Sequence, residues 1–274
     1  MIVALLHPGD MGVTAGRTLQ ASGHRVRWWR HGRSAATRAR AEQAGFEGVE
    51  DLASLLDGAD AVLSVCPPSA ALEVAKQVVE AGFEGVYVDA NAVSPATVGR
   101  LQALLGARLV DGGIIGPPAR TPGTTRLYLS GPGAGTVAGW FAAGPLQALA
   151  LDGPPGAASA LKMCYAAYTK GASALLLMVR ALAASEGVSD SLLAEWALSQ
   201  PGLAERSDAA ARATAAKAWR FEGEMHEIAD TVAAAGLPEG FHRAAAVLYG
   251  RMAPLKDAPS PGIDEVVAAL IGRH

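Results

Sequence analysis

The strongest constraint on the fold is a long proline-free run that follows a Pro/Gly turn. Residues 153–184 open with Gly153-Pro154-Pro155-Gly156 and continue with Ala, Leu and Met, which are strong helix formers. At 1.5 Å per residue such a helix spans roughly 40 Å, which is longer than one small domain needs. We therefore expect it to leave one domain and form the spine of the next, with residues 1–153 in the first domain and 154–274 in the second.

Composition limits the classes of function. The chain has 274 residues, of which 50% are hydrophobic, enough for the core of one large or two modest domains. A formal net charge of -3 gives no reason to expect nucleic acid or an anionic membrane as a partner. The apolar start 1–6 is too short for a signal peptide, and the run 172–184, interrupted by Arg180, is too short to cross a bilayer. We expect a soluble, cytoplasmic protein.

The cysteines and the known metal-binding motifs exclude two kinds of site. Cys66 and Cys164 are the only cysteines, so the sequence holds no disulfide framework and no pair with metal-ligand spacing. No HExxH motif is present, and we expect no catalytic metal.

The first half alternates short β-rich runs with helical patterns, which is typical of an α/β sheet wound with helices. We predict strands at 2–6, 25–29, 61–65, 86–89, 108–111, 126–130 and 148–151. We predict helices between the early strands at 12–21, 33–44, 70–81 and 95–105. The second half predicts helices at 189–199, 203–235, 238–252 and 263–271. The expected fold is an N-terminal Rossmann-type doubly wound parallel sheet followed by an all-α C-terminal domain.

The turn after the first strand predicts a dinucleotide site. It reads HPGDMG at residues 7–12, and in the register G-x-G-x-x-G it keeps Gly9 and Gly12 but has His7 first. Amides of this loop and of the following helix start would face a pyrophosphate. We expect the cofactor contacts from Gly9, Asp10, Met11 and Gly12, and a backbone-positioning role for His7.

The end of the second predicted strand indicates which dinucleotide binds. Folds selective for NAD place an acidic residue about 20 residues beyond the loop, yet no acidic residue occurs between Asp10 and Glu42. Guanidinium groups, by contrast, grip a 2′-phosphate with paired hydrogen bonds. We predict NADP(H), clamped by Arg30, Arg33 and Ser34. The alternative is a solvated basic helix start.

Two later strand ends add candidates, because ligands in such sheets gather at the carboxyl ends of strands. Cys66 and Pro67 follow the strand 61–65 and are expected near the nicotinamide ribose, with Cys66 as a small apolar filler. Asn91 follows the strand 86–89 and is a further cofactor candidate. Ser94 before Pro95 predicts a helix N-cap.

These motifs, in this order, resemble the 6-phosphogluconate dehydrogenase-like superfamily, in its β-hydroxyacid dehydrogenase branch. The resemblance rests on HPGDMG, on DGGIIGP from Asp111, and on a GxxG-x-x-x-x-x-K pattern formed by Gly153, Gly156 and Lys162. The helical half resembles a subgroup whose C-terminal domain is poorly characterised. On its own, Lys162 on a partly polar helical stripe would most often be a solvated lysine. The resemblance implies that Lys162 is instead the general acid/base beside the nicotinamide ring. It also implies a homodimer through the helical domain, and the apolar second half of the long helix predicts the same.

Two positions depart from the family pattern. Ala166 stands where the family has an Asn four residues after the lysine, and Ile115-Gly116-Pro117 replaces a Ser-Gly-Gly that binds a substrate carboxylate. We expect Tyr165, Thr169 or Asn91 to supply the lost hydrogen bonds, and Gly113 to let the backbone approach the substrate closely. Further along, Arg220 and Glu224 stand four residues apart, a spacing that predicts a surface ion pair. The alternative is that Arg220, Glu224 or His226 faces the substrate.

Three functions stay open at this point. The first is an NADP(H)-dependent oxidoreductase that interconverts a small carbonyl compound and its alcohol. The second is an imine or enamine reductase, against which Lys162 argues because such enzymes usually replace the lysine. The third, from a different class, is a non-catalytic NADP(H)-binding sensor or scaffold.

Overall fold

The structure is a computed structural model that describes residues 1–272, the side chain of Asp257 excepted. Its contacts divide the chain into two compact units, Met1–Met163 and the part that begins at Cys164. Helix α7 (Ala157–Ser185) runs from one unit into the other, so its first two turns belong with the sheet. Each unit is described separately below.

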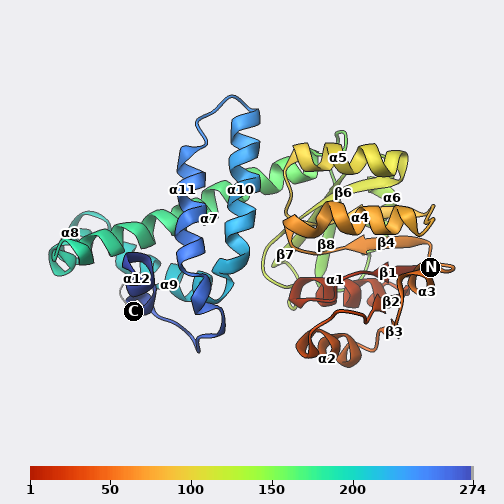
Figure 1. The fold of residues 1–274 in the computed structure, drawn as a ribbon, viewed down its shortest axis with the longest axis horizontal. Helices are drawn as coiled ribbons and strands as arrows, with labels where there is room; N and C mark the ends of the chain where they lie inside the picture. The colour runs from red at the N-terminus through yellow and green to blue at the C-terminus, as the bar shows by residue number, and fades with distance from the viewer. Residues whose placement is uncertain (273–274) are drawn as a thin grey trace. The chain divides into compact units, whose positions relative to one another are not determined.

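The first unit is built on one eight-stranded sheet within the described residues. The strands are β1 (Ile2–Leu5), β2 (Arg25–Trp29), β3 (Glu47–Val49), β4 (Ala61–Ser64), β5 (Val86–Asp89), β6 (Leu109–Ile115), β7 (Thr125–Ser130) and β8 (Leu146–Ala150). Their order across the sheet is β3-β2-β1-β4-β5-β6-β7-β8, and the strands from β3 to β6 are all parallel. This arrangement confirms the predicted Rossmann-type sheet (Figure 1).

One pairing differs from the expected all-parallel sheet. β7 runs antiparallel to β6, and β8 is parallel to β7. The reason is the length of the connection: residues 116–124 join β6 to β7 without a helix, whereas a parallel crossover needs a dozen or more residues. The predicted strand 108–111 also continues to Ile115, through Gly112 and Gly113.

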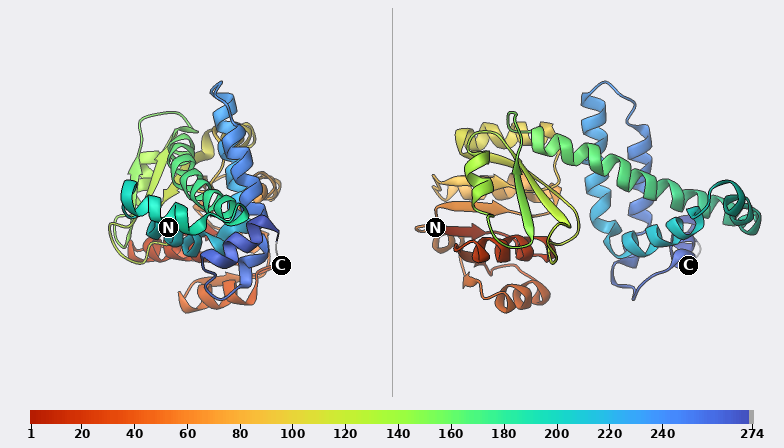
Figure 2. Two further views of the ribbon diagram at one scale, coloured as in Figure 1. Left: turned by 90° about the vertical axis from the view of Figure 1, so that its left-hand side faces the viewer. Right: turned by 180° about the vertical axis from the view of Figure 1, so that it is seen from behind.

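Helices cover both faces of the sheet (Figures 1 and 2). One core cluster joins the sheet to α1 (Asp10–Ala21), α2 (Ala35–Gln43) and α6 (Ala134–Gly139). The other joins it to α3 (Leu52–Leu56), α4 (Ala71–Glu80) and α5 (Pro95–Leu105). Short 3-10 turns lie at Pro68–Ala70 and Gly106–Arg108. The short elements β3, α3 and α6 were not predicted, because each is too brief to show a period.

The second unit contains helices. After α7 come α8 (Ser189–Ser199), α9 (Leu203–Thr214), α10 (Ala218–Ala234), α11 (Gly240–Arg251) and α12 (Ile263–Ile271), with 3-10 turns at Ala215–Lys217 and Ala253–Asp257. α10 and α11 lie side by side (Figure 1). The predicted continuous helix 203–235 is wrong, because the chain breaks at 215–217. Thr214 donates its hydroxyl back to the Ala210 carbonyl at 2.8 Å, a bond that bends helices.

Candidate functional site

The turn between β1 and α1 has the geometry of an anion-binding loop. A Cβ on Gly12 would lie 2.2 Å from the His7 carbonyl oxygen, so this position requires glycine. A Cβ on Gly9 would meet nothing within 4 Å, so the space above the loop is open. No side chain in the described part of the chain caps the first turn of α1. Amides at such a helix start can bind an anion, and their contact with a pyrophosphate stays a prediction.

His7 lies at the carboxyl end of β1 with a polar atom that lacks a partner. Its Nδ1 is buried and makes no hydrogen bond to any described residue. Burial, and then the charge of Arg33, lower the pKa of His7 from 6.5 to about 4. The imidazole is therefore neutral at neutral pH.

Arg33 lies over the carboxyl edge of the sheet. Its guanidinium packs 5.2 Å from the centre of the Trp29 ring, and its Nε donates to the Trp29 carbonyl at 3.4 Å. Its charge acts on His7 and on the Cys66 thiol, which places it near the ends of β1 and β4. Burial lowers the pKa of this guanidinium below its ordinary value. A cation held there suits an anionic group bound above the loop.

The other two members of the predicted clamp have local partners. Arg30 points along β3, where its Nη1 lies 3.3 Å from Glu50 Oε1 and a Cβ on Gly48 would meet its Nε at 2.2 Å. Ser34 is the N-cap of α2 and accepts a hydrogen bond from the Thr37 amide at 3.3 Å. Their roles toward a cofactor stay predictions, and Arg33 has the geometry that suits the clamp best.

Asn91 ties two strand ends together. It is 2% exposed, and its Oδ1 accepts from the Cys66 amide at 2.5 Å. Its Nδ2 donates to Ser64 Oγ at 3.1 Å and to Asp89 Oδ1 at 2.6 Å. These bonds fix the turn that carries Cys66 and Pro67, so any effect of Asn91 on a cofactor would pass through that turn.

Cys66 itself is not a reactive thiol. Burial, and then the Asp89 carboxylate, raise its pKa to about 12. This agrees with the expected role as a filler, while Pro67 beside it is exposed at the end of β4.

A buried carboxylate whose role no sequence motif indicated holds the start of α7 on the sheet. Asp111 of β6 is fully buried, and its Oδ2 accepts from the Gly156 amide, the Ser159 amide and Ser130 Oγ at 2.9 to 3.0 Å. Its Oδ1 accepts from Ser159 Oγ at 2.6 Å. Ser130 Oγ also accepts from the Ala158 amide at 3.0 Å. Asp111 thus satisfies the amides that a helix start leaves open.

This anchor brings Lys162 against the strand that follows Asp111. A Cβ on Gly113 would lie 2.7 Å from the Ala158 carbonyl oxygen and 3.0 Å from Lys162 Cβ. The backbone of β6 is therefore in direct contact with the second turn of α7, and Lys162 is half-buried. Gly113 and Lys162, predicted separately, lie together at the carboxyl half of β6.

The remaining predicted site residues lie in the second unit. Tyr165 is 48% exposed, and Thr169 donates its hydroxyl to the Tyr165 carbonyl at 3.1 Å, within α7. Their contact with a substrate stays a prediction. The expected ion pair between Arg220 and Glu224 is wrong: Glu224 pairs with Lys170 of α7 inside the helical unit, and Arg220 stacks on Trp219.

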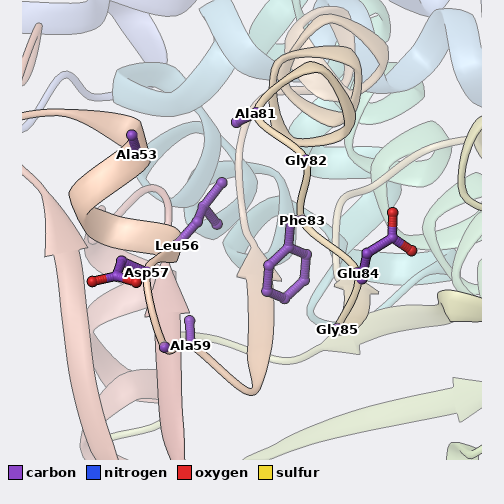
Figure 3. Close-up of a pocket in the computed structure, with 10 residues that line it drawn as sticks. Ala53, Leu56, Asp57, Ala59, Ala81, Gly82, Phe83, Glu84 and Gly85 are labelled. Carbon is purple, nitrogen blue, oxygen red and sulfur yellow. The ribbon is translucent and has the colours of Figure 1, made fainter.

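A shallow pocket lies at the opposite, amino-terminal ends of β4 and β5. Leu56 and Phe83 line it from different segments of the chain, while the carboxylates of Asp57 and Glu84 point away from both side chains (Figure 3). Because ligands of such sheets bind at the carboxyl ends of strands, we do not assign this pocket to the site.

Residues 1–272 contain neither a metal-binding cluster nor a helix suited to cross a membrane. No three side chains of His, Cys, Asp or Glu gather as they would around a metal ion. Nor does any described helix combine the length and the apolar character that a membrane crossing requires.

Sequence comparison matches residues 183–252 to a domain of unknown function, DUF1932. An uncharacterised 28.5 kDa protein from Methanothermus fervidus is 34% identical over 164 residues, covering 59% of this chain and 63% of that protein. A glycerol-3-phosphate dehydrogenase [NAD(P)+] of Streptococcus suis is 34% identical over 91 residues, covering 29% and 27%. The chain thus matches less than two thirds of the length of either curated relative.

Solved structures match nearly the whole chain. A conserved protein of unknown function, described as structurally similar to 3-hydroxyacid dehydrogenases, has 25% identity and a TM-score of 0.65, covering 94% of this chain and 100% of that one. Mycobacterium tuberculosis 3-hydroxyisobutyrate dehydrogenase has 18% identity and a TM-score of 0.69, covering 98% of each chain. A reductive aminase from Aspergillus terreus, solved with NADPH, has 20% identity and a TM-score of 0.55, covering 97% of each.

The last two likenesses concern the fold alone, and that fold is the one the sequence motifs predict. The chain thus carries a DUF1932 region in its helical part and shares its fold with 3-hydroxyisobutyrate dehydrogenase and with a protein described as structurally similar to 3-hydroxyacid dehydrogenases.

Proposed function

We propose that the protein is an NADP(H)-dependent oxidoreductase that interconverts a small carbonyl compound and its alcohol, with Lys162 as general acid/base. The observation that carries this proposal is the contact between Gly113 and Lys162, with Asp111 anchoring the same helix start. It places the half-buried Lys162 beside the carboxyl half of β6, the sheet edge at which the glycine loop also opens. The dehydrogenase and reductase names of the related proteins support the same class of reaction.

The chain's own residues supply binding and proton transfer in this scheme. The nicotinamide, when bound, supplies or accepts the hydride. Lys162 as an ammonium would donate a proton from Nζ to the oxygen of the carbonyl group as the hydride reaches its carbon, which completes the alcohol. In the reverse direction the neutral amine of Lys162 would take that proton back. The first turn of α1 would hold the pyrophosphate, and Arg33 a 2′-phosphate.

The preference for NADP(H) over NAD(H) rests on charge. Within residues 1–272 Arg33 contacts the ring and the carbonyl of Trp29 and pairs with no carboxylate, and its cation lies above the carboxyl edge of the sheet. A 2′-phosphate would complement this cation, whereas the 2′-hydroxyl of NAD(H) would leave it without an anion.

A homodimer is part of the proposal. Four large side chains on α7 follow a heptad spacing and are exposed: Tyr168 at 77%, Leu175 at 43%, Met178 at 40% and Leu182 at 58%. An apolar stripe of this kind needs cover, and a second copy of α7 would provide it. Sedimentation at micromolar concentration tests this: we expect a dimer that Leu182→Glu dissociates, and a monomeric wild type would contradict it.

The function is tested with purified protein in two steps. Fluorescence titration with NADPH and NADH comes first, followed by an NADPH-consumption screen over keto acids, aldehydes, ketones and cyclic imines. Lys162→Ala is the test variant, and Lys76→Ala, which removes an exposed lysine of α4, is its matched control. NADPH binding with carbonyl turnover that only Lys162→Ala abolishes supports the proposal.

Other outcomes of this screen identify the alternatives. Turnover of imines but not of carbonyl compounds indicates an imine reductase, a chemistry that the likeness to the NADPH-bound reductive aminase makes worth including. NADPH binding without turnover on any compound, and without effect of Lys162→Ala, indicates a sensor or scaffold. Failure to bind either nucleotide would overturn the proposal.

A further inference from the structure

The loop that joins β6 to β7, residues 116–124, is fastened to the dinucleotide loop. The Ala119 amide donates to Thr14 Oγ1 of α1 at 3.0 Å, and Thr14 Oγ1 in turn donates to the Met11 carbonyl at 2.9 Å. Both residues are buried, Thr14 at 5% exposed and Ala119 at 2%. The connection therefore couples two loops that lie over one hundred positions apart in the chain, through a hydroxyl with both bonds satisfied.

The loop is also held in shape by its own residues. Gly116 has a φ of +124°, and a Cβ there would lie 2.4 Å from the Thr124 carbonyl oxygen. Thr125 Oγ1 donates to the Pro117 carbonyl at 2.6 Å, and the Arg120 amide donates to the Pro118 carbonyl at 2.8 Å. The backbone that carries the side chain of residue 120 is thus held in one conformation.

Arg120 lies at the start of α1 as a result. Its Nη2 is 2.9 Å from Oδ1 of Asp10, the first residue of that helix, and Arg40 Nε lies 3.9 Å from the same oxygen. The Arg120 side chain is 69% exposed, so much of its planar group faces solvent beside the loop. One carboxylate and two guanidinium groups leave a net positive charge where the glycine loop opens.

The position of Arg120 explains how an acidic residue, Asp10, can stand at the start of a helix that binds an anion. Asp10 suits the positive end of the α1 dipole, but its carboxylate would repel a pyrophosphate bound to the same amides. Arg120 can keep one N–H on Asp10 and offer others to a phosphate oxygen, because a guanidinium carries five donors in one plane.

We propose that Arg120 binds the cofactor pyrophosphate, so that the β6–β7 loop, anchored through Thr14, closes over the dinucleotide loop. This inference rests on the proposed function and assigns the loop a cofactor role in place of the carboxylate-binding role that the family resemblance implies. Since NADH and NADPH share the pyrophosphate, Arg120 must act on both alike, in contrast to Arg33.

The test is the dissociation constant of each nucleotide, measured by nicotinamide fluorescence without substrate. Arg120→Ala should weaken NADPH and NADH about equally, by roughly tenfold, the loss expected for one charge-assisted hydrogen bond. Arg100→Ala, which removes an exposed arginine of α5 that donates to Thr97 Oγ1, is the matched control and should leave both constants unchanged. The melting temperature without nucleotide should be nearly the same in all three proteins, because an exposed ion pair contributes little to stability.

The Asp10→Asn background separates direct contact from charge compensation. If Arg120 contacts the pyrophosphate, Arg120→Ala weakens binding by a similar factor in this background. If the effect disappears there, Arg120 only neutralises Asp10 and the proposal is wrong. Unchanged constants with a raised KM for substrate would assign Arg120 to the substrate and also overturn it. A wild type that binds neither nucleotide would instead refute the proposed function itself.

Discussion

Gly113 of β6 lies directly against Lys162 of α7, because a Cβ at position 113 would sit 3.0 Å from the Cβ of that lysine and 2.7 Å from the Ala158 carbonyl oxygen. Gly113→Ala must therefore push the second turn of α7 away from the strand. We expect a loss of about 1–3 kcal/mol in the free energy of unfolding. We expect turnover to fall by on the order of ten- to a hundredfold, since small displacements of a catalytic group are costly.

Gly99→Ala is the matched control for this experiment. Gly99 lies in α5, and a Cβ there would meet nothing within 4 Å. Both variants are compared by urea unfolding and by steady-state turnover. If Gly113→Ala retained wild-type turnover, the contact would have no part in placing Lys162.

The hydrogen bonds of Asp111 should make a large contribution to the free energy of unfolding. Asp111→Ala leaves the amides of Gly156 and Ser159 without their acceptor in a fully buried position. We expect a loss of about 3 kcal/mol or more in the free energy of unfolding. Ser159→Ala, which keeps the carboxylate and removes one donor, should cost only about 1 kcal/mol. Equal effects of the two changes in urea unfolding would contradict the anchoring role.

The lowered pKa of His7 should make the stability of the protein depend on pH. Its pKa is about 4 in the fold, below the ordinary value of 6.5, so the unfolded chain takes up the proton first as the pH falls. The neutral imidazole's contribution is fully present above about pH 6.5 and is lost as the pH falls toward about 4, to a total of about 3 kcal/mol.

The comparison that isolates this contribution uses His7→Gln. The difference in unfolding free energy between wild type and His7→Gln should change by up to about 3 kcal/mol over that pH range. His31→Gln, which removes an exposed histidine, should show no comparable change. A pH-independent difference for His7→Gln would show that the imidazole is not held neutral by the fold.

Arg33 should determine the preference for NADPH over NADH. Arg33→Ala should weaken NADPH by roughly ten- to a hundredfold and leave NADH nearly unchanged, because only NADPH carries the 2′-phosphate. Ser34→Ala is informative beside it, since Ser34 caps α2 and its loss should cost about 1 kcal/mol of stability. An unchanged ratio of the two dissociation constants in Arg33→Ala would place the clamp elsewhere.

Much of the fold was predictable because it follows from local patterns. The strands at 25–29 and 86–89, and the helices at 95–105, 189–199 and 263–271, have the predicted bounds. The N-cap at Ser94 is confirmed as well, with Pro95 at the first helical position. Each of these has a period or a capping residue in its own sequence.

The contacts that the sequence did not predict all depend on tertiary structure. Asp111 caps a helix that begins 46 residues later in the chain, so no local spacing reveals it. The same holds for Ala119 and Thr14, whose hydrogen bond spans 105 positions. The i,i+4 spacing predicts Arg220 as the partner of Glu224, but the packing of α10 on α7 gives Glu224 the partner Lys170. Local spacing predicts elements and loops, whereas the partner of a polar side chain depends on which elements meet.

The central claim is that Lys162 moves a proton in an NADPH-dependent reaction. The most direct measurement compares wild type and Lys162→Ala in single-turnover oxidation of bound NADPH, with the dissociation constant of NADPH determined for both. We predict a dissociation constant within about twofold of wild type and a rate of hydride transfer lowered by about 10²–10⁴, the usual contribution of a general acid. A rate unchanged by Lys162→Ala, with NADPH bound, would contradict the assignment.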